Sequence, residues 1–309
     1  MDNDVFIIMV TYNGMHWLPK TMSSIPKKYK IVIIDNCSTD NTIKFINTNY
    51  PNVIVLPQKT NLGFGGGNNI GIKYAIKNNA NFVFLLNQDA YLYNDTIENL
   101  IDVSKKKPEF AIISPIHLDS TALNLDWNFS TYLKAEDTNS LKYFLRYPDQ
   151  DFNQVYTTNF VNAAAWLLPK KTLETIGGFD PIFFHYGEDN NYCQRVIYHQ
   201  LKIAVVSNAY VIHDREYRGL NKNISLEYAL KKREKKLKIV WADINNDFSE
   251  KVKIRKKILK KKLLKAFLKI EVRKFKEYKA ELSLIDNIVP EIIKSRNVNV
   301  LKGSHYLNE

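Results

Sequence analysis

The sequence contains the run Phe82-Val83-Phe84-Leu85-Leu86-Asn87-Gln88-Asp89-Ala90, in which five apolar residues end abruptly in two amides and a carboxylate. A short apolar run bounded by polar residues is typical of a buried central strand in a parallel sheet. In open α/β sheets, ligands bind just beyond the carboxyl ends of such strands. Asp89 is therefore a candidate to hold a divalent cation against a phosphate. The alternative is an aspartate that caps the next helix or shapes a turn.

Three further apolar runs precede this stretch, over residues 5–10, 31–34 and 53–56. Helical segments between them predict right-handed βαβ units and a parallel sheet. Polar residues follow the first run at Thr11-Tyr12-Asn13-Gly14 and the second at Asp35-Asn36-Cys37-Ser38-Thr39-Asp40. We therefore expect Asp35 and Asp89 to lie along one edge of the sheet.

A glycine cluster follows the third strand: Asn61-Leu62-Gly63-Phe64-Gly65-Gly66-Gly67-Asn68-Asn69. It lacks the last glycine of the dinucleotide-binding fingerprint and follows the wrong strand for it. It also lacks the Gly-Lys-Ser or Gly-Lys-Thr of a phosphate-binding loop. We interpret these glycines as positions where the backbone comes close to a ligand or where a helix begins under the sheet.

The pattern loosens after residue 115. Residues 118–154 are aromatic and polar without a clear period, which predicts either a functional lid or binding surface, or an inserted hairpin that simply packs. Further on, Glu188 and Asp189 open a predicted helix, where the helix dipole favours carboxylates. Two short strands are expected over residues 203–206 and 211–214, with His213 at the end of the second.

The composition limits the possible classes of protein. A chain of 309 residues with 45% hydrophobic content can form one large α/β domain with a tail, or two domains. Two cysteines, Cys37 and Cys193, exclude a disulfide framework and fit a cytoplasmic location. No apolar run is long enough to span a bilayer. The acidic N-terminus leads straight into a strand and is not expected to be a signal peptide.

The net charge of +12 is concentrated in one segment. Residues 231–276 hold 19 Lys or Arg against 5 Asp or Glu, a balance of +14 that leaves the rest of the chain at −2. Apolar residues recur there at helical spacing: Ile254, Ile258, Leu263, Phe267, Ile270 and Phe275. This region is predicted either to form a helical hairpin packed on the main domain or to lie on an anionic membrane. Binding to nucleic acid is not expected, because no recognised nucleic-acid fold accompanies the charge.

Six motifs in order resemble those of the family 2 glycosyltransferases, which have the nucleotide-sugar-binding GT-A fold. The resemblance covers roughly residues 5–220. It rests on Val10-Thr11-Tyr12-Asn13, the segment from Asp35 to Asp40, the glycine cluster continued through Gly71, Asn87-Gln88-Asp89, Glu188-Asp189, and His213. The glycine cluster is similar to one that is frequent in rhamnosyl- and galactofuranosyltransferase-like members.

The resemblance implies a role for each motif. Asp89 and His213 would hold Mg²⁺ or Mn²⁺, Asp189 would be the general base, and Glu188 would orient a neighbouring group. The nucleotide sugar would meet residues along the sheet edge: Thr11, Tyr12, Asn13, Asp35, Asn36, Asn61, Gly66, Asn68, Asn87 and Gln88. The acceptor would lie near Asn162, Trp166 and Arg195.

Two positions depart from the family pattern. Asn87 replaces the first carboxylate of the Asp-x-Asp motif, so Asp89 would be the main protein ligand of the cation. Asn191 replaces the last carboxylate of the Glu-Asp-x-Asp motif, which removes a supporting interaction more than the base itself.

The implied activity is metal-dependent, inverting glycosyl transfer. The donor would be dTDP-rhamnose or a UDP-sugar such as UDP-galactofuranose, and the acceptor a hydroxyl of a growing surface polysaccharide linked to a polyprenyl lipid. One alternative is a nucleotidyltransferase that makes a sugar nucleotide, although the first strand lacks the glycine-rich motif with a basic residue that it would need. Another is a catalytically silent scaffold in polysaccharide assembly, which Asn87 and Asn191 keep open.

The expected architecture is an α/β fold of the GT-A type, a sheet flanked by helices, followed by a basic α-helical C-terminal region. The catalytic domain would span residues 1–220, with a nucleotide-sugar half over 1–115 and an acceptor half over 116–220. The helical region would span 221–309. A cytoplasmic location is expected, peripheral on the inner face of the cytoplasmic membrane if the basic helices bind lipid. The sequence predicts no oligomeric state.

Overall fold

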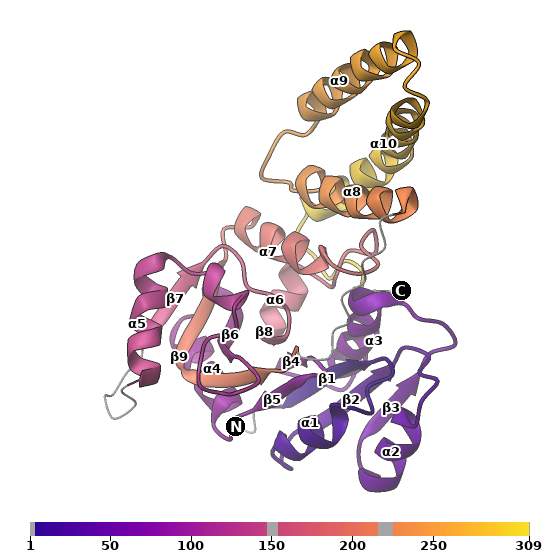
Figure 1. The fold of residues 1–309 in the computed structure, drawn as a ribbon. Helices are drawn as coiled ribbons and strands as arrows, with labels where there is room; N and C mark the ends of the chain where they lie inside the picture. The colour runs from indigo at the N-terminus through magenta and orange to yellow at the C-terminus, as the bar shows by residue number, and fades with distance from the viewer. Residues whose placement is uncertain (1–3, 147–153, 216–224, 309) are drawn as a thin grey trace.

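A computed structural model describes residues 4–146, 154–215 and 225–308 (Figure 1). A mixed sheet with helices on both faces forms the body of the molecule. The last three helices stand off from this body, and the turn between α9 and α10 lies at the far end (Figure 1). None of the helices in these ranges is long and apolar enough to cross a membrane.

The described strands form one nine-stranded sheet in the order β3-β2-β1-β4-β8-β6-β9-β5, with β7 paired to β9. Their bounds are β1 Val5–Thr11, β2 Lys30–Asp35, β3 Ile54–Pro57, β4 Phe82–Leu86, β5 Ala90–Leu92, β6 Phe110–Leu118, β7 Val155–Thr158, β8 Ala165–Pro169 and β9 Lys202–His213. The first four predicted strands are confirmed and are parallel to one another. β4 lies between β1 and the antiparallel β8, so its apolar run is buried as predicted.

The prediction of two short strands near residues 203–214 is wrong. They form one strand, β9, which runs parallel to β6 with a register shift between Pro115 and Ile116. The irregularity interrupts the apolar pattern without ending the strand, because a bulge keeps the ladder on both sides of it.

Each face of the sheet carries its own hydrophobic core. Phe6 and Ile8 of β1 face one core with α3, α6 and α7, whereas Ile7 and Met9 face the other with α1, α2 and α4. This alternation is the period of two that a strand imposes. The helices are α1 Leu18–Ser24, α2 Thr42–Asn49, α3 Gly63–Lys77, α4 Thr96–Lys106, α6 Lys170–Thr175 and α7 Glu188–Tyr198.

The region without sequence periodicity holds more regular structure than the sequence predicts. A 3₁₀ turn spans Phe129–Thr131 and a helix, α5, spans Ala135–Arg146. Phe129 and Leu141 are buried in the core beside α7, so this segment is anchored to the body. The rest of the predicted lid, residues 147–153, lies outside the described residues.

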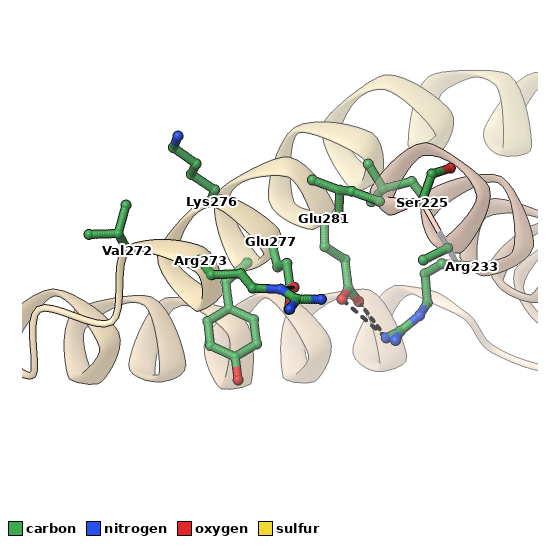
Figure 2. A pocket seen from close by; sticks show the side chains of 11 residues that line it. Ser225, Arg233, Val272, Arg273, Lys276, Glu277 and Glu281 are labelled. Carbon is green, nitrogen blue, oxygen red and sulfur yellow. Dashed lines mark hydrogen bonds and ion pairs between the residues drawn. The ribbon is translucent and has the colours of Figure 1, made fainter. Parts of the chain in front are cut away.

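The C-terminal region folds as three helices with a hydrophobic core of their own: α8 Leu226–Trp241, α9 Ser249–Leu268 and α10 Val272–Asn299. A buried carboxylate ties them together, because Glu281 of α10 pairs with Arg233 of α8 and Arg255 of α9. Figure 2 shows Arg233 and Glu281 facing each other beside a pocket between α8 and α10. The boundary proposed at residue 220 lies outside the described residues.

The C-terminal end of α10 is docked on the body through a second buried carboxylate, that of Asp180. Asp180 accepts hydrogen bonds from Ser295 Oγ at 2.6 Å and from Asn299 Nδ2 at 2.7 Å. The chain after α10 continues the contact, since Gly178 N donates to His305 O at 2.8 Å. The helical region is therefore fixed at one end and projects from the body at the other (Figure 1).

Gly71 tests the packing of α3 on the sheet. A Cβ at this position would lie 2.3 Å from Ile8 Cγ2 and 2.6 Å from Ile34 Cδ1, both on buried strands. We expect Gly71→Ala to lower the free energy of unfolding by about 1–3 kcal/mol through overpacking. Urea denaturation followed by circular dichroism measures this.

Gly66→Ala in the same helix is the control. The added Cβ would meet a single atom, Leu62 Cβ at 3.2 Å, and Leu62 is 38% exposed, so that a small shift relieves the contact. The expected change is within roughly 0.5 kcal/mol. Equal destabilisation by the two substitutions would contradict the packing assigned to Gly71.

Candidate active site

The pairing of β5 with β9 brings the two predicted metal ligands together. Ala90 lies opposite His213 in this antiparallel ladder, so the preceding residue, Asp89, meets the histidine side chain. Asp89 Oδ1 is 3.5 Å from His213 Nε2, and both side chains are almost fully buried. Within the described residues, no three His, Cys, Asp or Glu side chains gather in a way that could hold a metal ion. Among the described residues, the candidate metal ligands are therefore the two side chains of this pair, Asp89 and His213.

Arg215, which the sequence analysis missed, contacts the ring of His213. Its Nη2 lies 3.2 Å from His213 Nδ1. Because a guanidinium can only donate, a hydrogen bond here has Nδ1 as the acceptor, and Nε2 is the ring nitrogen that faces Asp89. Arg215 Nε is also 2.9 Å from Asp126 Oδ2. Arg215 comes two residues after His213, and side chains two apart lie on the same side of an extended chain. This spacing is the sequence signal that could have predicted the contact between them.

A second histidine lies behind the first. The rings of His117 and His213 meet edge to face with centroids 6.0 Å apart, and His117 stacks on Phe129. Burial, with the neighbouring His213 and Arg215, holds the pKa of His117 well below its usual range. His117 is therefore neutral and serves as a rigid wall.

The loops after β1 and β2 are held by the polar residues predicted to bind the nucleotide. Asp35 is fully buried, and its carboxylate accepts hydrogen bonds from Thr11 Oγ1 and from Ser38. Asn13 Oδ1 accepts from Thr39 N at 2.8 Å. Asp35 therefore shapes the loop, and its reach to a base or ribose remains a proposal.

The backbone around Tyr12 is fixed by the end of β4. Gln88 Oε1 accepts from Tyr12 N at 2.9 Å, and Gln88 Nε2 donates to Tyr12 O at 3.3 Å. The Tyr12 side chain is left 49% exposed. An exposed aromatic ring at the end of a central strand offers a face on which a base can stack.

The glycine cluster forms the first turns of α3 and lies against the loop that precedes α7, the helix that carries the predicted base. Gly63 has a φ of +73°, and a Cβ there would lie 1.8 Å from Phe184 O. Asn36 Nδ2 donates to Gly63 O at 2.9 Å, and Asn61 Oδ1 accepts from Gly63 N at 2.8 Å. Asn68 is buried and bonds within its own helix. The glycines thus allow a close approach of two loops.

The predicted base lies at the first turn of α7, after a strained turn. Tyr186 and Gly187 have φ of +65° and +106°. Two successive residues in this region are uncommon, and such strain is often found at functional sites. Glu188 is buried, and desolvation together with the neighbouring Asp189 raises the pKa of its carboxyl to about 8. Burial also raises the pKa of Asp189.

Two residues outside the predicted set connect the base to the rest of the site. Tyr132 lies within electrostatic reach of Arg215 and of Asp189, and burial raises its pKa to about 12. Lys235 of α8 places its ammonium 4.7 Å from the centre of the Tyr186 ring and acts to lower the pKa of Asp189. Nothing in the sequence pattern distinguishes Lys235 from the other lysines of the basic region.

Several buried polar atoms near the base and the end of β4 have no hydrogen-bond partner in the described part of the chain. They are Asn87 Oδ1, Asn162 Oδ1, Trp166 Nε1, Glu188 Oε2, and both amide atoms of Asn191. Buried polar groups are usually paired, and each exception calls for an explanation. These atoms come from the residue after β4, the segment before β8, β8 itself and α7. Asn87 and Asn162 are partly exposed, so hydroxyl groups of a sugar could pair with their amide oxygens, whereas Trp166 and Asn191 are fully buried.

Two of the predicted acceptor-side residues are buried. Arg195 is 1% exposed, and its guanidinium donates to Ile176 O at 2.9 Å and to Gly178 O. Trp166 is 0% exposed and stacks on Phe179. Arg195 therefore holds the turn that receives the C-terminal helix, and its acceptor-side role stays a prediction. Asn162 is half-buried and stays a candidate.

Comparison with known proteins identifies the family and the fold. The family described as "Glycosyl transferase family 2" matches residues 6–177, more than half of the chain. The low-salt glycan biosynthesis hexosyltransferase Agl10 of Haloferax volcanii is 23% identical over 216 residues, which cover 70% of this chain and 68% of that protein. The N-acetylglucosaminyl-diphospho-decaprenol L-rhamnosyltransferase of Mycobacterium tuberculosis is 23% identical over 243 residues, covering 68% of this chain and 76% of that protein.

A solved structure of S. aureus TarS 1-349 in complex with UDP-GlcNAc shares the fold. The TM-score is 0.56 at 16% sequence identity, and the similarity covers 96% of this chain and 88% of that one. The predicted GT-A-type fold is thereby confirmed.

Glu188 makes stability depend on pH in a way that can be measured. Its carboxyl has a pKa of about 8 in the folded chain against an ordinary value of 4.5. Between these values the folded state binds a proton that the unfolded state has released, so stability falls as pH rises. Glu188→Gln should remove this pH dependence. From pH 5 to pH 8, its unfolding free energy should fall by on the order of 2–4 kcal/mol less than that of the wild type. Denaturant unfolding at both pH values measures it.

The control substitution is Glu174→Gln, because the Glu174 side chain is 58% exposed. It should leave the difference in unfolding free energy between pH 5 and pH 8 unchanged. If Glu188→Gln leaves that difference unchanged as well, Glu188 is not held protonated by its surroundings.

Proposed function

This chain belongs to glycosyl transferase family 2, and on that premise we propose that it transfers a sugar from a nucleoside-diphosphate donor to a hydroxyl of a growing polysaccharide. The observation that carries the proposal is the set of unpartnered buried polar atoms at the sheet end. It includes Asn87 beside the Asp89–His213 pair and Glu188 beside the predicted base. A site for a nucleotide sugar needs polar groups that can pair with the hydroxyls of the sugar ring. It also needs groups that can hold the charged diphosphate, directly or through a cation.

The proposed step is direct displacement with inversion. A hydroxyl oxygen of the acceptor attacks the anomeric carbon and forms a new C–O bond. The bond from that carbon to the diphosphate oxygen breaks, and the nucleoside diphosphate leaves with the electron pair. Asp189 takes the hydroxyl proton, and burial raises its pKa, which makes it a stronger base. Such a base contributes about 10²–10⁴-fold to the rate.

Glu188 is unsuited to act as a nucleophile in a double displacement. A carboxyl group with a pKa of about 8 is mostly protonated at neutral pH. In that state it can donate a hydrogen bond to a substrate oxygen, which fits an orienting role. This state of Glu188 supports inversion over retention.

The pair at the end of β4 fits a divalent cation, Mg²⁺ or Mn²⁺. Asp89 offers a carboxylate oxygen, and such ions are commonly held by one or two carboxylates with substrate phosphates and water. His213 would join through Nε2 once Arg215 releases Nδ1, since the ring proton can then move to Nδ1. When bound, the ion would offset the negative charge that gathers on the leaving diphosphate.

The relatives suggest the class of donor and acceptor. One is described as a hexosyltransferase of glycan biosynthesis and one as a rhamnosyltransferase that acts on a decaprenol-linked sugar. We therefore propose dTDP-rhamnose or a UDP-sugar as the donor and a polyprenyl-linked saccharide as the acceptor.

Asp189→Asn tests the assignment of the base. We expect kcat for sugar transfer to fall by about 10²–10⁴-fold, because the amide cannot take the hydroxyl proton. Donor affinity should stay within about twofold. Release of UDP or dTDP from labelled donors in the presence of a polyprenyl-diphosphate-linked acceptor measures the rate, and calorimetry measures donor binding.

Glu188→Gln is the matched control at the adjacent position, and its kcat should fall by no more than about tenfold because an amide can still donate a hydrogen bond. Near-normal turnover by Asp189→Asn with intact donor binding would contradict the assignment. A wild-type chain that binds the donor but transfers to no acceptor would favour the silent scaffold.

A further inference from the structure

The turn between α9 and α10 carries a group of exposed large apolar side chains, which we call the hairpin tip. Its members and their exposed fractions are Leu264 at 60%, Phe267 at 65%, Leu268 at 71%, Ile270 at 83% and Val272 at 59%. Ile270 has the largest exposed fraction of the large hydrophobic residues in the described ranges. Single exposed apolar residues are common, but a contiguous exposed group marks an interaction site.

The buried core of the three helices does not include these residues, and the one aromatic contact among them joins Phe267 to Phe275 of α10, with ring centroids 6.1 Å apart. The buried positions of α9 are Val252, Leu259 and Ala266, a repeat of seven that faces α10 and α8. The apolar positions singled out in the sequence, by contrast, include Ile254, Ile258, Phe267 and Ile270, which are 41–83% exposed. The helical spacing predicted from these residues is confirmed, but these four side chains are not the ones buried between the helices. The helix carries a second apolar surface that the hairpin leaves open.

The conformation of Ile270 is a separate observation. Glu271 N donates to Ala266 O and Ile270 N donates to Phe267 O, which is the hydrogen-bond pattern of a Schellman motif. Ile270 occupies the left-handed position of this motif, with a φ of +54°. Glycine or asparagine usually takes that position, and a β-branched residue there is an outlier. An isoleucine that is both strained and exposed is unfavourable for the free protein.

The surroundings of the hairpin tip are strongly basic. Residues 260–276 contain eight Lys or Arg and one acidic residue, Glu271, and all eight basic residues are exposed. Lys274 pairs with Glu271 and Arg273 with Glu277, each at 3.1 Å, which leaves six further positive charges around five apolar side chains. The tip lies at the end of the helical region that is far from the sheet (Figure 1).

A pocket of about 640 Å³ between α8 and α10 opens beside the tip, and Val272 lines both (Figure 2). Its lining is mixed: Leu226, Leu230 and Tyr278 add apolar surface, and five charged residues line it as well, namely Arg233, Arg273, Lys276, Glu277 and Glu281. In Figure 2, Val272 lies at one end of this pocket, and Lys276 points away from it. Apolar groups that enter beside the tip would thus find further apolar contacts.

We propose that the hairpin tip inserts into the interface of an anionic lipid bilayer. An anionic surface matches the ring of positive charges, and the acyl region takes up the apolar side chains. A second copy of the chain fits less well, because two tips would bring two clusters of six positive charges together. Nucleic acid matches the charge but offers no burial for five aliphatic and aromatic side chains. The inference needs no donor or acceptor and stands apart from the proposed chemistry.

Vesicle flotation of the full chain tests the proposal. Vesicles of phosphatidylcholine with 30% phosphatidylglycerol are compared with pure phosphatidylcholine in 0.1 M NaCl. We expect the chain to float with the anionic vesicles and to bind the neutral ones at least about tenfold more weakly, since each basic residue near an anionic surface favours binding. Phe267→Ser combined with Leu268→Ser should weaken binding to anionic vesicles about tenfold or more.

Ile270→Gly separates membrane insertion from folding. Glycine suits the left-handed position, so this variant should keep or raise its melting temperature while binding anionic vesicles several-fold more weakly. Ile254→Ser is the control, because Ile254 is 53% exposed on the same helix but lies away from the tip. It should bind like the wild type.

Three results would overturn the proposal. The first is no flotation of the wild type with anionic vesicles, and the second is binding that the tip variants leave unchanged. The third is a concentration-dependent dimer, measured by sedimentation, that Phe267→Ser abolishes, because the partner would then be a second copy. Binding of the donor is measured on the same samples. A variant that binds the donor normally but not the vesicles shows that membrane binding fails independently of the proposed transfer reaction.

Discussion

The site depends on the antiparallel pairing of β5 with β9. β5 is three residues long, and it turns the chain back directly after Asp89, so that His213 comes to face that carboxylate. A main-chain hydrogen bond joins the same two segments, since Asp214 N donates to Asp89 O at 2.8 Å. β9 is held in turn by β6 and β7. The charged groups expected to meet the diphosphate are thus fixed by main-chain ladders before any substrate arrives, which is the preorganisation that electrostatic catalysis needs.

The C-terminal helices support the other half of the site. Asp180, Ser295 and Asn299 join α10 to the loop that precedes α7, and α8 brings Lys235 to the ring of Tyr186. A Cβ on Gly187 would lie 2.9 Å from Ile239 Cγ1 of α8, so the turn before the base fits tightly against that helix. One end of the helical region therefore shapes the environment of Asp189, while the opposite end presents the hairpin tip.

Local patterns in the sequence were enough for the first half of the fold. The apolar composition of Phe82–Leu86 predicts a buried strand, and the acidic pair Glu188 and Asp189 predicts the start of a helix. The parts that escaped prediction depend on tertiary contacts. The β9 register shift, the helix at Ala135–Arg146 and the outward apolar face of α9 are decided by what packs against them. The structural contacts of Asp35 and Arg195 could not be predicted for the same reason, because a buried polar side chain that shapes a loop has the same sequence signal as one that binds a ligand.

A thermal-shift panel with UDP, dTDP, GDP and CDP, each with Mn²⁺ and with EDTA, tests the central claim most directly. A ligand that binds the folded state raises the melting temperature by mass action. The account predicts a shift for UDP or dTDP that requires Mn²⁺ and disappears in Asp89→Ala. The absence of any shift in the wild type, or an equal shift in EDTA and in Asp89→Ala, would contradict a nucleoside-diphosphate site built on the Asp89–His213 pair.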